Sequence, residues 1–244
     1  MASQDRSKFL PHADPAAFPD SSYVLGDLLA ERFTCRAYRP EPVEEAVIGR
    51  MLELAQMSAS WCNTQPWNVI VTQGEATERF RAALFAEASS DGHEGQPGID
   101  YPRSFPGVHG ERRREVGWQL YDSVGVRKGD RAASREQALE NFRLFGAPHV
   151  ALICCERELG AYGAIDCGVY LGTLLLAAQS LGLGMTPQAA LAEHSALIRR
   201  HFAVPDNLMF VVGASFGHAD QDHAANSFRS RRAPVGENAR LVKA

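Results

Sequence analysis

Ser58-Ala59-Ser60-Trp61-Cys62-Asn63-Thr64-Gln65-Pro66-Trp67 joins an amphipathic segment to an apolar run of strand length. The stretch combines small hydroxyl side chains, side-chain amides and two indoles. Hydroxyl and amide groups donate and accept hydrogen bonds, and an indole offers a flat apolar surface. This loop therefore predicts contacts to a planar polar heterocycle, such as an organic cofactor, rather than to a metal ion or to a phosphate alone.

The segments around this loop alternate between helical and strand periodicity. We expect a helix from Ser21 or Ser22, as its cap, to about Arg32, and a second one from about Pro42 to Leu54. Further helices are expected at about 75–88, 111–124, 131–145, 163–183 and 193–202, and strands at about 67–72, 148–155 and 208–214. Strands separated by helices indicate a layered α/β or α+β domain.

The helix expected at 163–183 is apolar nearly all round, which indicates a central core helix or a subunit interface. The apolar run inside it, about 171–183, is interrupted by polar residues and glycines, so we expect it to be too short for a membrane span.

The chain divides into an arm and one domain. Residues 1–20 are polar and contain three prolines, so we expect a mobile N-terminal arm, followed by a single domain over 21–244. Within that domain, 89–110 holds five glycines and three prolines. We expect residues 89–130, called the lid segment below, to form an insertion that covers a site, with aromatic and arginine side chains for substrate. A flexible surface excursion is the alternative.

Composition excludes several classes of protein. The net charge of −4 gives no reason to propose nucleic-acid binding. The five cysteines are odd in number and show no CxxC or zinc-ligand spacing, which argues against a disulfide framework and fits a reducing cytoplasm. The N-terminus has no apolar core of a signal peptide, so we expect a cytoplasmic protein without a membrane anchor.

Arginines gather at two places far apart in the chain. Arg32 and Arg36 flank Thr34 at the end of the first expected helix, and three more arginines lie within 229–232. Guanidinium groups bind phosphate bidentately, so two such patches can converge on one phosphate. Either patch alone is equally consistent with ordinary surface charge.

Taken together, the 58–67 loop and the two arginine patches resemble the FMN-dependent nitroreductase family, in the order that this family has them. Within this family, the Trp-Cys-Asn-Thr-Gln-Pro-Trp sequence and the arginine-rich 101–147 segment are most similar to those of bacterial enzymes acting on nitrobenzoates and related nitroaromatics. The resemblance implies an α+β fold with a central, mainly antiparallel sheet surrounded by helices. It also implies a homodimer with two FMN sites at the interface.

The resemblance assigns roles to residues of this chain. It implies that the FMN phosphate is held by Arg32, Thr34, Arg36, Arg229 and Arg232, and it leaves the role of Arg231 open because the spacing aligns in two ways. It implies that Ser60, Trp61 and Asn63 contact the flavin held mainly by the other subunit, and that Phe33 and Gln65 also belong to the FMN site. Pro187, Gln188, Ala189 and Ala190 match the segment beside flavin N5, where a backbone amide near Ala189 donates. Many relatives have Glu-Gly where this chain has Ala189-Ala190.

The implied chemistry is a ping-pong reaction in which NADH or NADPH reduces FMN, leaves, and a nitroaromatic compound takes its place. No side chain acts as a covalent nucleophile and no metal is required. Gly182-Leu183-Gly184 is followed by Pro187 and so lacks the dinucleotide fingerprint, which makes NAD(P)H a transient ligand. The alternatives are reductive dehalogenation, enone reduction or azoline oxidation on the same fold, or a flavin-binding sensor with little turnover.

Two other motifs suggest different chemistry. Gly213-Ala214-Ser215-Phe216-Gly217 satisfies G-x-S-x-G, which in serine hydrolases requires a helix directly after the serine. The run His218–His223 carries metal-ligand side chains but no regular element that would preorganise them. We expect both matches to be accidental.

Overall fold

A four-stranded sheet forms the centre of the molecule. The structure, a computed structural model, describes residues 20–90, 95 and 97–243. The strands are β1 (Asn68–Val71), β2 (His149–Glu156), β3 (Gly184–Gln188) and β4 (Leu208–Gly217), in the order β1-β2-β4-β3. All three pairings are antiparallel, so the expected antiparallel-rich sheet is confirmed. The expected N-terminal arm, residues 1–20, lies outside the described residues except for Asp20.

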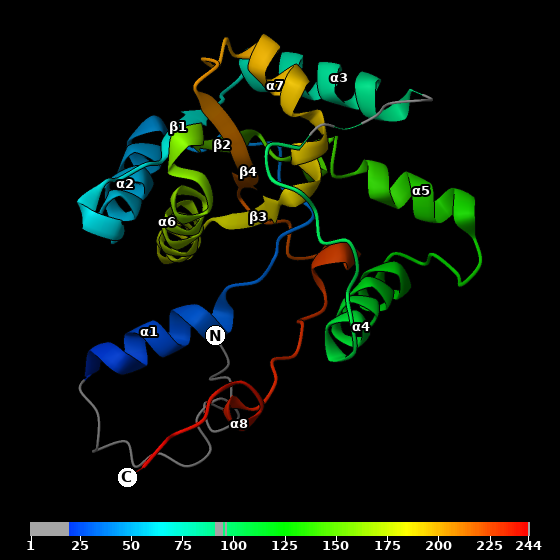
Figure 1. The fold of residues 1–244 in the computed structure, drawn as a ribbon. Coiled ribbons are helices and arrows are strands. Elements are labelled where there is room, and N and C mark those ends of the chain that lie inside the picture. The colour runs from blue at the N-terminus through cyan, green and yellow to red at the C-terminus, as the bar shows by residue number, and fades with distance from the viewer. Residues whose placement is uncertain (1–19, 91–94, 96, 244) are drawn as a thin grey trace.

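Helices cover both faces of the sheet (Figure 1). On one face lie α2 (Glu45–Gln56) and α6 (Gly160–Ser180), and on the other lie α3 (Glu75–Ser89) and α7 (Ser195–His201). Strand β2 is buried on both sides, because Ala151 and Ile153 face the first pair of helices while Val150 and Leu152 face the second. This burial explains the continuous apolar run of β2, which an exposed sheet face would not allow.

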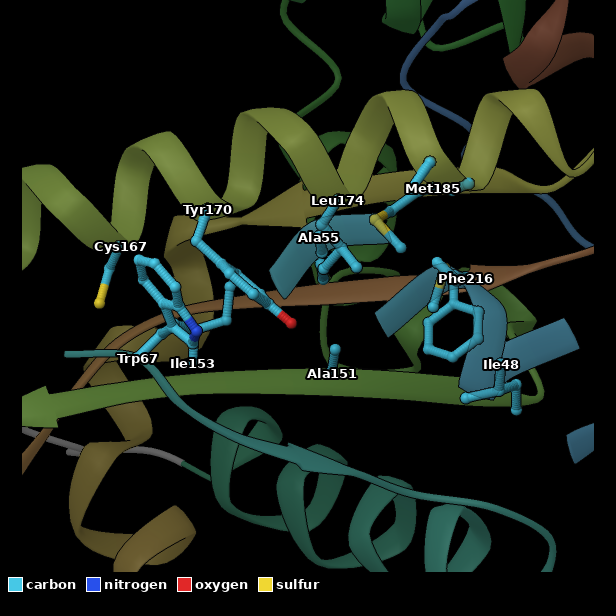
Figure 2. Close-up of a cluster of buried hydrophobic side chains, with 14 of the residues drawn as sticks. Ile48, Ala55, Trp67, Ala151, Ile153, Cys167, Tyr170, Leu174, Met185 and Phe216 are labelled. Atoms are coloured by element: carbon cyan, nitrogen blue, oxygen red, sulfur yellow. The ribbon is translucent and has the colours of Figure 1, made fainter. Parts of the chain in front are cut away.

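The core between α6 and the sheet contains one of the two indoles of the 58–67 loop (Figure 2). Trp67 is 9% exposed and stacks on Tyr170 with ring centroids 5.0 Å apart. Its Nε1 donates to Oε1 of Gln56 at 3.0 Å, which satisfies the indole N–H. Trp67 is therefore a core residue that fixes where the loop ends and β1 begins.

Four helices lie outside the three layers (Figure 1). They are α1 (Asp20–Glu31), α4 (Val108–Ser123), α5 (Arg131–Leu139) and α8 (Val235–Asn238). Helix α1 already includes Asp20, so Ser21 and Ser22 lie in its first turn and do not cap it as expected. Short 3₁₀ helices connect the elements, at Trp61–Asn63 (η3), Leu144–Gly146 (η4), Arg157–Leu159 (η5), Ala189–His194 (η6) and Ala224–Asn226 (η7).

Helix α6 begins and ends three residues earlier than expected. Together with the 3₁₀ turn before it, the helical run Arg157–Ser180 spans 24 residues and contains an 18-residue window with a mean hydropathy of 1.4, which is enough to cross a membrane by length and composition alone. The expectation that the apolar run at about 171–183 is too short for a membrane span concerned a shorter stretch, which overlaps the end of this run. Within the domain the helix packs on α2, β2 and β3, and the core helix of a globular protein meets the same criterion.

Candidate functional site

The segment containing Arg32 and Arg36 lies against the edge strand of the sheet. Thr34 bridges Met185 of β3, and the Cys35 N–H donates to the Met185 carbonyl at 3.3 Å. This contact requires Gly184, since a Cβ there would lie 2.8 Å from Cys35 Sγ. The glycine therefore allows the two segments to pack closely.

The C-terminal tail is fastened to the same segment by Asn226, which is 3% exposed. Its Oδ1 accepts from the Arg36 N–H at 2.7 Å, and its Nδ2 donates to the carbonyls of Ala37 at 2.9 Å and Asp220 at 2.7 Å. Sequence reasoning missed Asn226, because a single asparagine in a polar turn has no periodic or motif signal.

The two arginine patches converge as expected. The Arg229 guanidinium carbon lies 4.0 Å from the centroid of Phe33, and that of Arg36 lies 5.8 Å from the centroid of Phe228. Burial lowers the pKa of Arg32, and the positive charge of Arg232 lowers it further. We call Arg32, Arg36, Arg229 and Arg232 the arginine cluster.

The arginine cluster has no acidic partner in the part of the chain that the structure describes. Burial also lowers the pKa of Arg36 and of Arg229, as expected for partly desolvated cations. Arg231, in contrast, pairs with Glu115 at 2.7 Å. A group of uncompensated guanidinium ions fits a phosphate dianion, so these residues suit the terminal phosphate of FMN.

Strand β3 leads into the second predicted contact. Ala189 and Ala190 open η6, and the first N–H groups of a helical turn have no partner within that turn. Tyr101 of the lid segment donates its hydroxyl proton to the Ala189 carbonyl at 2.6 Å. Pro187 and Ala190 are half-buried and Ala189 is exposed, so the 189–190 turn lies at the surface.

The packing of η6 depends on a second glycine. Gly213 of β4 pairs with Gln188, and a Cβ at Gly213 would lie 2.5 Å from Leu191 Cδ1. With hydrogen at this position, Leu191 lies directly on the sheet and holds the 189–190 turn at its edge.

The exposed part of the 58–67 loop lies elsewhere. The Trp61 N–H donates to the Asp166 carboxylate at 3.1 and 3.2 Å, and the Trp61 indole, 62% exposed, lies 4.7 Å from the Tyr162 ring. Ser60 Oγ accepts from the Gln65 N–H at 2.9 Å. Asn63 and Gln65 have φ angles of 56° and 46°, in the left-handed region that non-glycine residues seldom adopt.

Within one chain, this loop and the arginine cluster are not in direct contact. Ser60, Trp61, Asn63 and Gln65 bond within the loop or to Gln56 of α2 and Asp166 of α6. Among the described residues, none of these four shares a hydrogen bond, ion pair or ring contact with any residue of the arginine cluster.

The G-x-S-x-G motif does not form the strand-to-helix turn of the serine hydrolases. Ser215 lies inside β4 with no exposed surface, and its hydroxyl donates to Gln188 Oε1 at 2.5 Å. In the 218–223 run, His223 Nδ1 accepts from the Ala225 N–H at 3.2 Å. Across 20–90, 95 and 97–243, no three His, Cys, Asp or Glu side chains are grouped to hold a metal ion.

The described lid residues place aromatic and basic groups side by side. Trp118 of α4 is 42% exposed, and its ring lies 5.9 Å from that of Tyr121. The Arg113 guanidinium lies 5.0 Å from the Phe105 centroid. A groove of about 430 Å³ between α4 and the tail is lined by Arg112, Arg113, Val116, Ser230, Arg231, Arg232, Ala233 and Asn238.

Comparison with known proteins agrees with this geometry. The nitroreductase family model matches residues 29–218. The nitroreductase NfnB of Mycolicibacterium smegmatis is 35% identical, over 92% of this chain and 95% of its own length. A 4-nitrobenzoate reductase of Pseudomonas putida is 31% identical, over 84% of this chain and 89% of its own. The crystal structure of the FMN-dependent NfnB from Mycobacterium smegmatis in complex with NADPH superposes with a TM-score of 0.87, at 33% identity, covering 92% of this chain and all of that one. The chain belongs to the nitroreductase family.

Proposed function

We propose that this protein is an FMN-dependent NAD(P)H oxidoreductase that reduces nitroaromatic compounds. The observation that carries the proposal is the arginine cluster, which both chain ends build and which no carboxylate of the described residues neutralises. The relatives described above, one of them an FMN-dependent enzyme in complex with NADPH, support the same cofactor and donor.

In this proposal the side chains and backbone of the protein bind FMN and orient it. Arg32, Arg36, Arg229 and Arg232 hold the phosphate, with Phe33 and Thr34 shaping the pocket wall beside them. The amide near Ala189 donates to flavin N5, next to Pro187, Gln188 and Ala190. FMN, when bound, supplies the chemistry, by taking a hydride from NAD(P)H and passing electrons to the nitro group.

We further propose a homodimer with FMN at the interface. The lack of a direct contact between Trp61 or Asn63 and the arginine cluster in the described chain supports it, because a second subunit can then supply the 58–67 loop to a flavin held by the first. The exposed apolar side chains Tyr162, Ile165 and Val169 on α6 are consistent with contact to a second subunit. All five cysteines are free thiols, which supports a place in the cytoplasm.

Two finer features belong to the proposal. The reaction is ping-pong, since donor and oxidant use the same flavin face in turn. The lid segment selects the substrate, with Trp118 stacking on a nitroarene and an arginine pairing with a ring carboxylate, as in a nitrobenzoate.

Steady-state kinetics tests the proposal. NADH or NADPH consumption is measured anaerobically with 4-nitrobenzoate at several fixed concentrations. A ping-pong nitroreductase gives parallel double-reciprocal lines and oxidation of NAD(P)H that depends on the nitro compound. Flavin binding without such oxidation indicates a sensor instead, and turnover only with a halogenated arene, an enone or a peptide azoline indicates one of the other reactions of this fold.

A further inference from the structure

The side chain of Gln188 is buried at the end of β3, directly before the 189–190 turn. It is 1% exposed, and both ends of its amide are hydrogen-bonded. Oε1 accepts from Ser215 Oγ at 2.5 Å, and Nε2 donates to the Asn141 carbonyl at 2.7 Å. One side chain therefore connects β3, β4 and the turn that follows α5.

This connection occurs where the sheet itself holds the backbone weakly. β3 is an edge strand: β4 pairs with it along its length, the segment at Thr34 bridges it at Met185, and Pro187 has no N–H to give to the ladder. Past Gln188 the chain leaves the sheet and enters η6. The direction of the next peptide N–H, that of Ala189, therefore depends on contacts outside the ladder, and the bonds of the Gln188 side chain are the ones directly before it.

The bonds form part of a longer buried network. The Tyr38 hydroxyl lies 2.8 Å from Thr186 Oγ1 and 3.0 Å from the Ser215 carbonyl. Thr186 and Gln188 are two residues apart on one strand and so share a face of the sheet. Ser215 meets both of them, and it has no exposed surface. A network with every member satisfied fixes one arrangement, because each alternative leaves a buried polar group without a partner.

We infer that Gln188 is a positioning residue that, held by Ser215 and Asn141, aims the Ala189 amide at flavin N5. This rests on the proposed function. A donor raises the rate of hydride acceptance only if it already points to where charge develops, and small errors in its direction weaken it. The G-x-S-x-G match then marks a serine that acts through Gln188 and touches no substrate.

The test compares Gln188→Met, Ser215→Ala and a matched control, Thr77→Val. Thr77 is equally buried, and its hydroxyl lies 2.8 Å from that of Thr72, remote from β3. For each protein we measure FMN affinity of the apo form, the rate of flavin reduction by NADPH in stopped flow, the midpoint potential of the bound flavin and the Tm.

We expect Gln188→Met and Ser215→Ala to bind oxidised FMN within threefold of the wild type, because the arginine cluster is intact. Their flavin reduction slows about tenfold, and reduced flavin binds about tenfold more weakly relative to oxidised flavin. For a two-electron couple that is about 30 mV toward more negative potential. Thr77→Val lowers the Tm but changes neither the rate nor the potential.

The variant Gln188→Glu provides a second, pH-dependent test of the positioning role of Gln188. A protonated carboxyl accepts from Ser215 and donates to the Asn141 carbonyl, as the amide does, whereas the ionised form only accepts. We therefore expect its flavin reduction rate to recover as the pH falls, over a range in which the wild-type rate is flat.

The outcomes separate the two proposals. Wild-type protein that binds no FMN defeats the proposed function. The positioning role alone is defeated if NADPH reduces the wild-type protein and the variants behave like it. In that case Gln188→Met and Ser215→Ala have the wild-type reduction rate and midpoint potential, and the pH profile of Gln188→Glu is parallel to that of the wild type. If Gln188→Met fails to fold, Ser215→Ala and Gln188→Glu decide.

Discussion

Replacing Arg229 and Arg232 together with alanine tests the phosphate site directly. Arg229 is prearranged, because its Nη1 donates to the carbonyls of Asn226 at 2.7 Å and Phe228 at 2.9 Å and its guanidinium lies over Phe33. Arg232 is exposed and bonds only within 230–232 in the described structure. We therefore assign Arg229 a contribution near the upper end of the range for charged hydrogen bonds, about 3 kcal/mol, and Arg232 one near its lower end, about 1.5 kcal/mol.

The sum of about 4.5 kcal/mol corresponds to a loss of about three powers of ten in FMN affinity, at 1.4 kcal/mol per tenfold. The assay is fluorescence titration of the apo-protein at fixed ionic strength, because salt screens exposed charges. Riboflavin, which lacks the phosphate, serves as the second ligand, and its affinity stays within threefold. Arg231→Ala is the matched control, since Arg231 pairs with Glu115. We expect it to change FMN binding less than threefold.

Two results contradict the reasoning. If the double variant weakens riboflavin as much as FMN, the arginines hold the tail in place and do not bind phosphate. If it leaves FMN binding unchanged while Arg231→Ala reduces it, the alternative alignment of the tail is the correct one.

Three further predictions concern the cofactor, the lid segment and pH. Purified protein is yellow and releases FMN on denaturation, since the arginine cluster suits a terminal monophosphate; chromatography that finds FAD is incompatible with this site. Deleting residues 92–107, which leaves α4 whole, keeps FMN bound but shifts the ratio of kcat/KM for 4-nitrobenzoate to that for nitrobenzene; equal effects on both substrates, or loss of FMN, argue against a lid. Burial lowers the pKa of His149 below its ordinary 6.5, and its ring Nε2 accepts from the Val43 N–H. The unfolded chain thus takes up a proton that the folded chain does not, so the free energy of unfolding falls as the pH drops below about 6.5. Urea unfolding between pH 7.5 and 5.5 measures this fall, and His149→Gln, if it folds, lacks that part of it.

The layered fold was predictable because burial leaves periodic patterns. The apolar run of β2 indicates a strand covered on both sides, and the helical periodicity of α2 indicates one buried helix face. Both elements were expected close to their observed bounds. Strand β3 was missed, because Gly184, Thr186 and Pro187 do not make a strand pattern and only pairing with β4 holds them extended. Helix α5 ends at Leu139, short of the expected 145.

The backbone at 144–145 rules out the expected extension of this helix to 145. Leu144 and Phe145 adopt φ angles of 57° and 52°, which an α-helix cannot contain, yet nothing in these two side chains encodes a left-handed conformation. Both are buried in the core, so tertiary packing imposes the turn.

The site was predictable to the extent that it rests on charge and motif. The convergence of Arg32, Arg36 and Arg229 could be expected from a recognisable pattern. Which of Arg231 and Arg232 pairs with a carboxylate could not, because that depends on where Glu115 of α4 lies. The roles of Asn226 and Gln188 follow from single buried hydrogen bonds, which only the folded chain defines.

The proposed division of each FMN site between two subunits has a consequence for mixtures of inactive variants. In the proposed dimer each flavin takes its phosphate contacts from one subunit and its Trp61 and Asn63 from the other. Two inactive variants, one without the loop contacts and one without Arg229 and Arg232, should therefore complement each other when their subunits are mixed. The hybrid has one site that carries both lesions and one that carries neither, so a quarter of the wild-type activity returns if subunits exchange at random and in equal amounts.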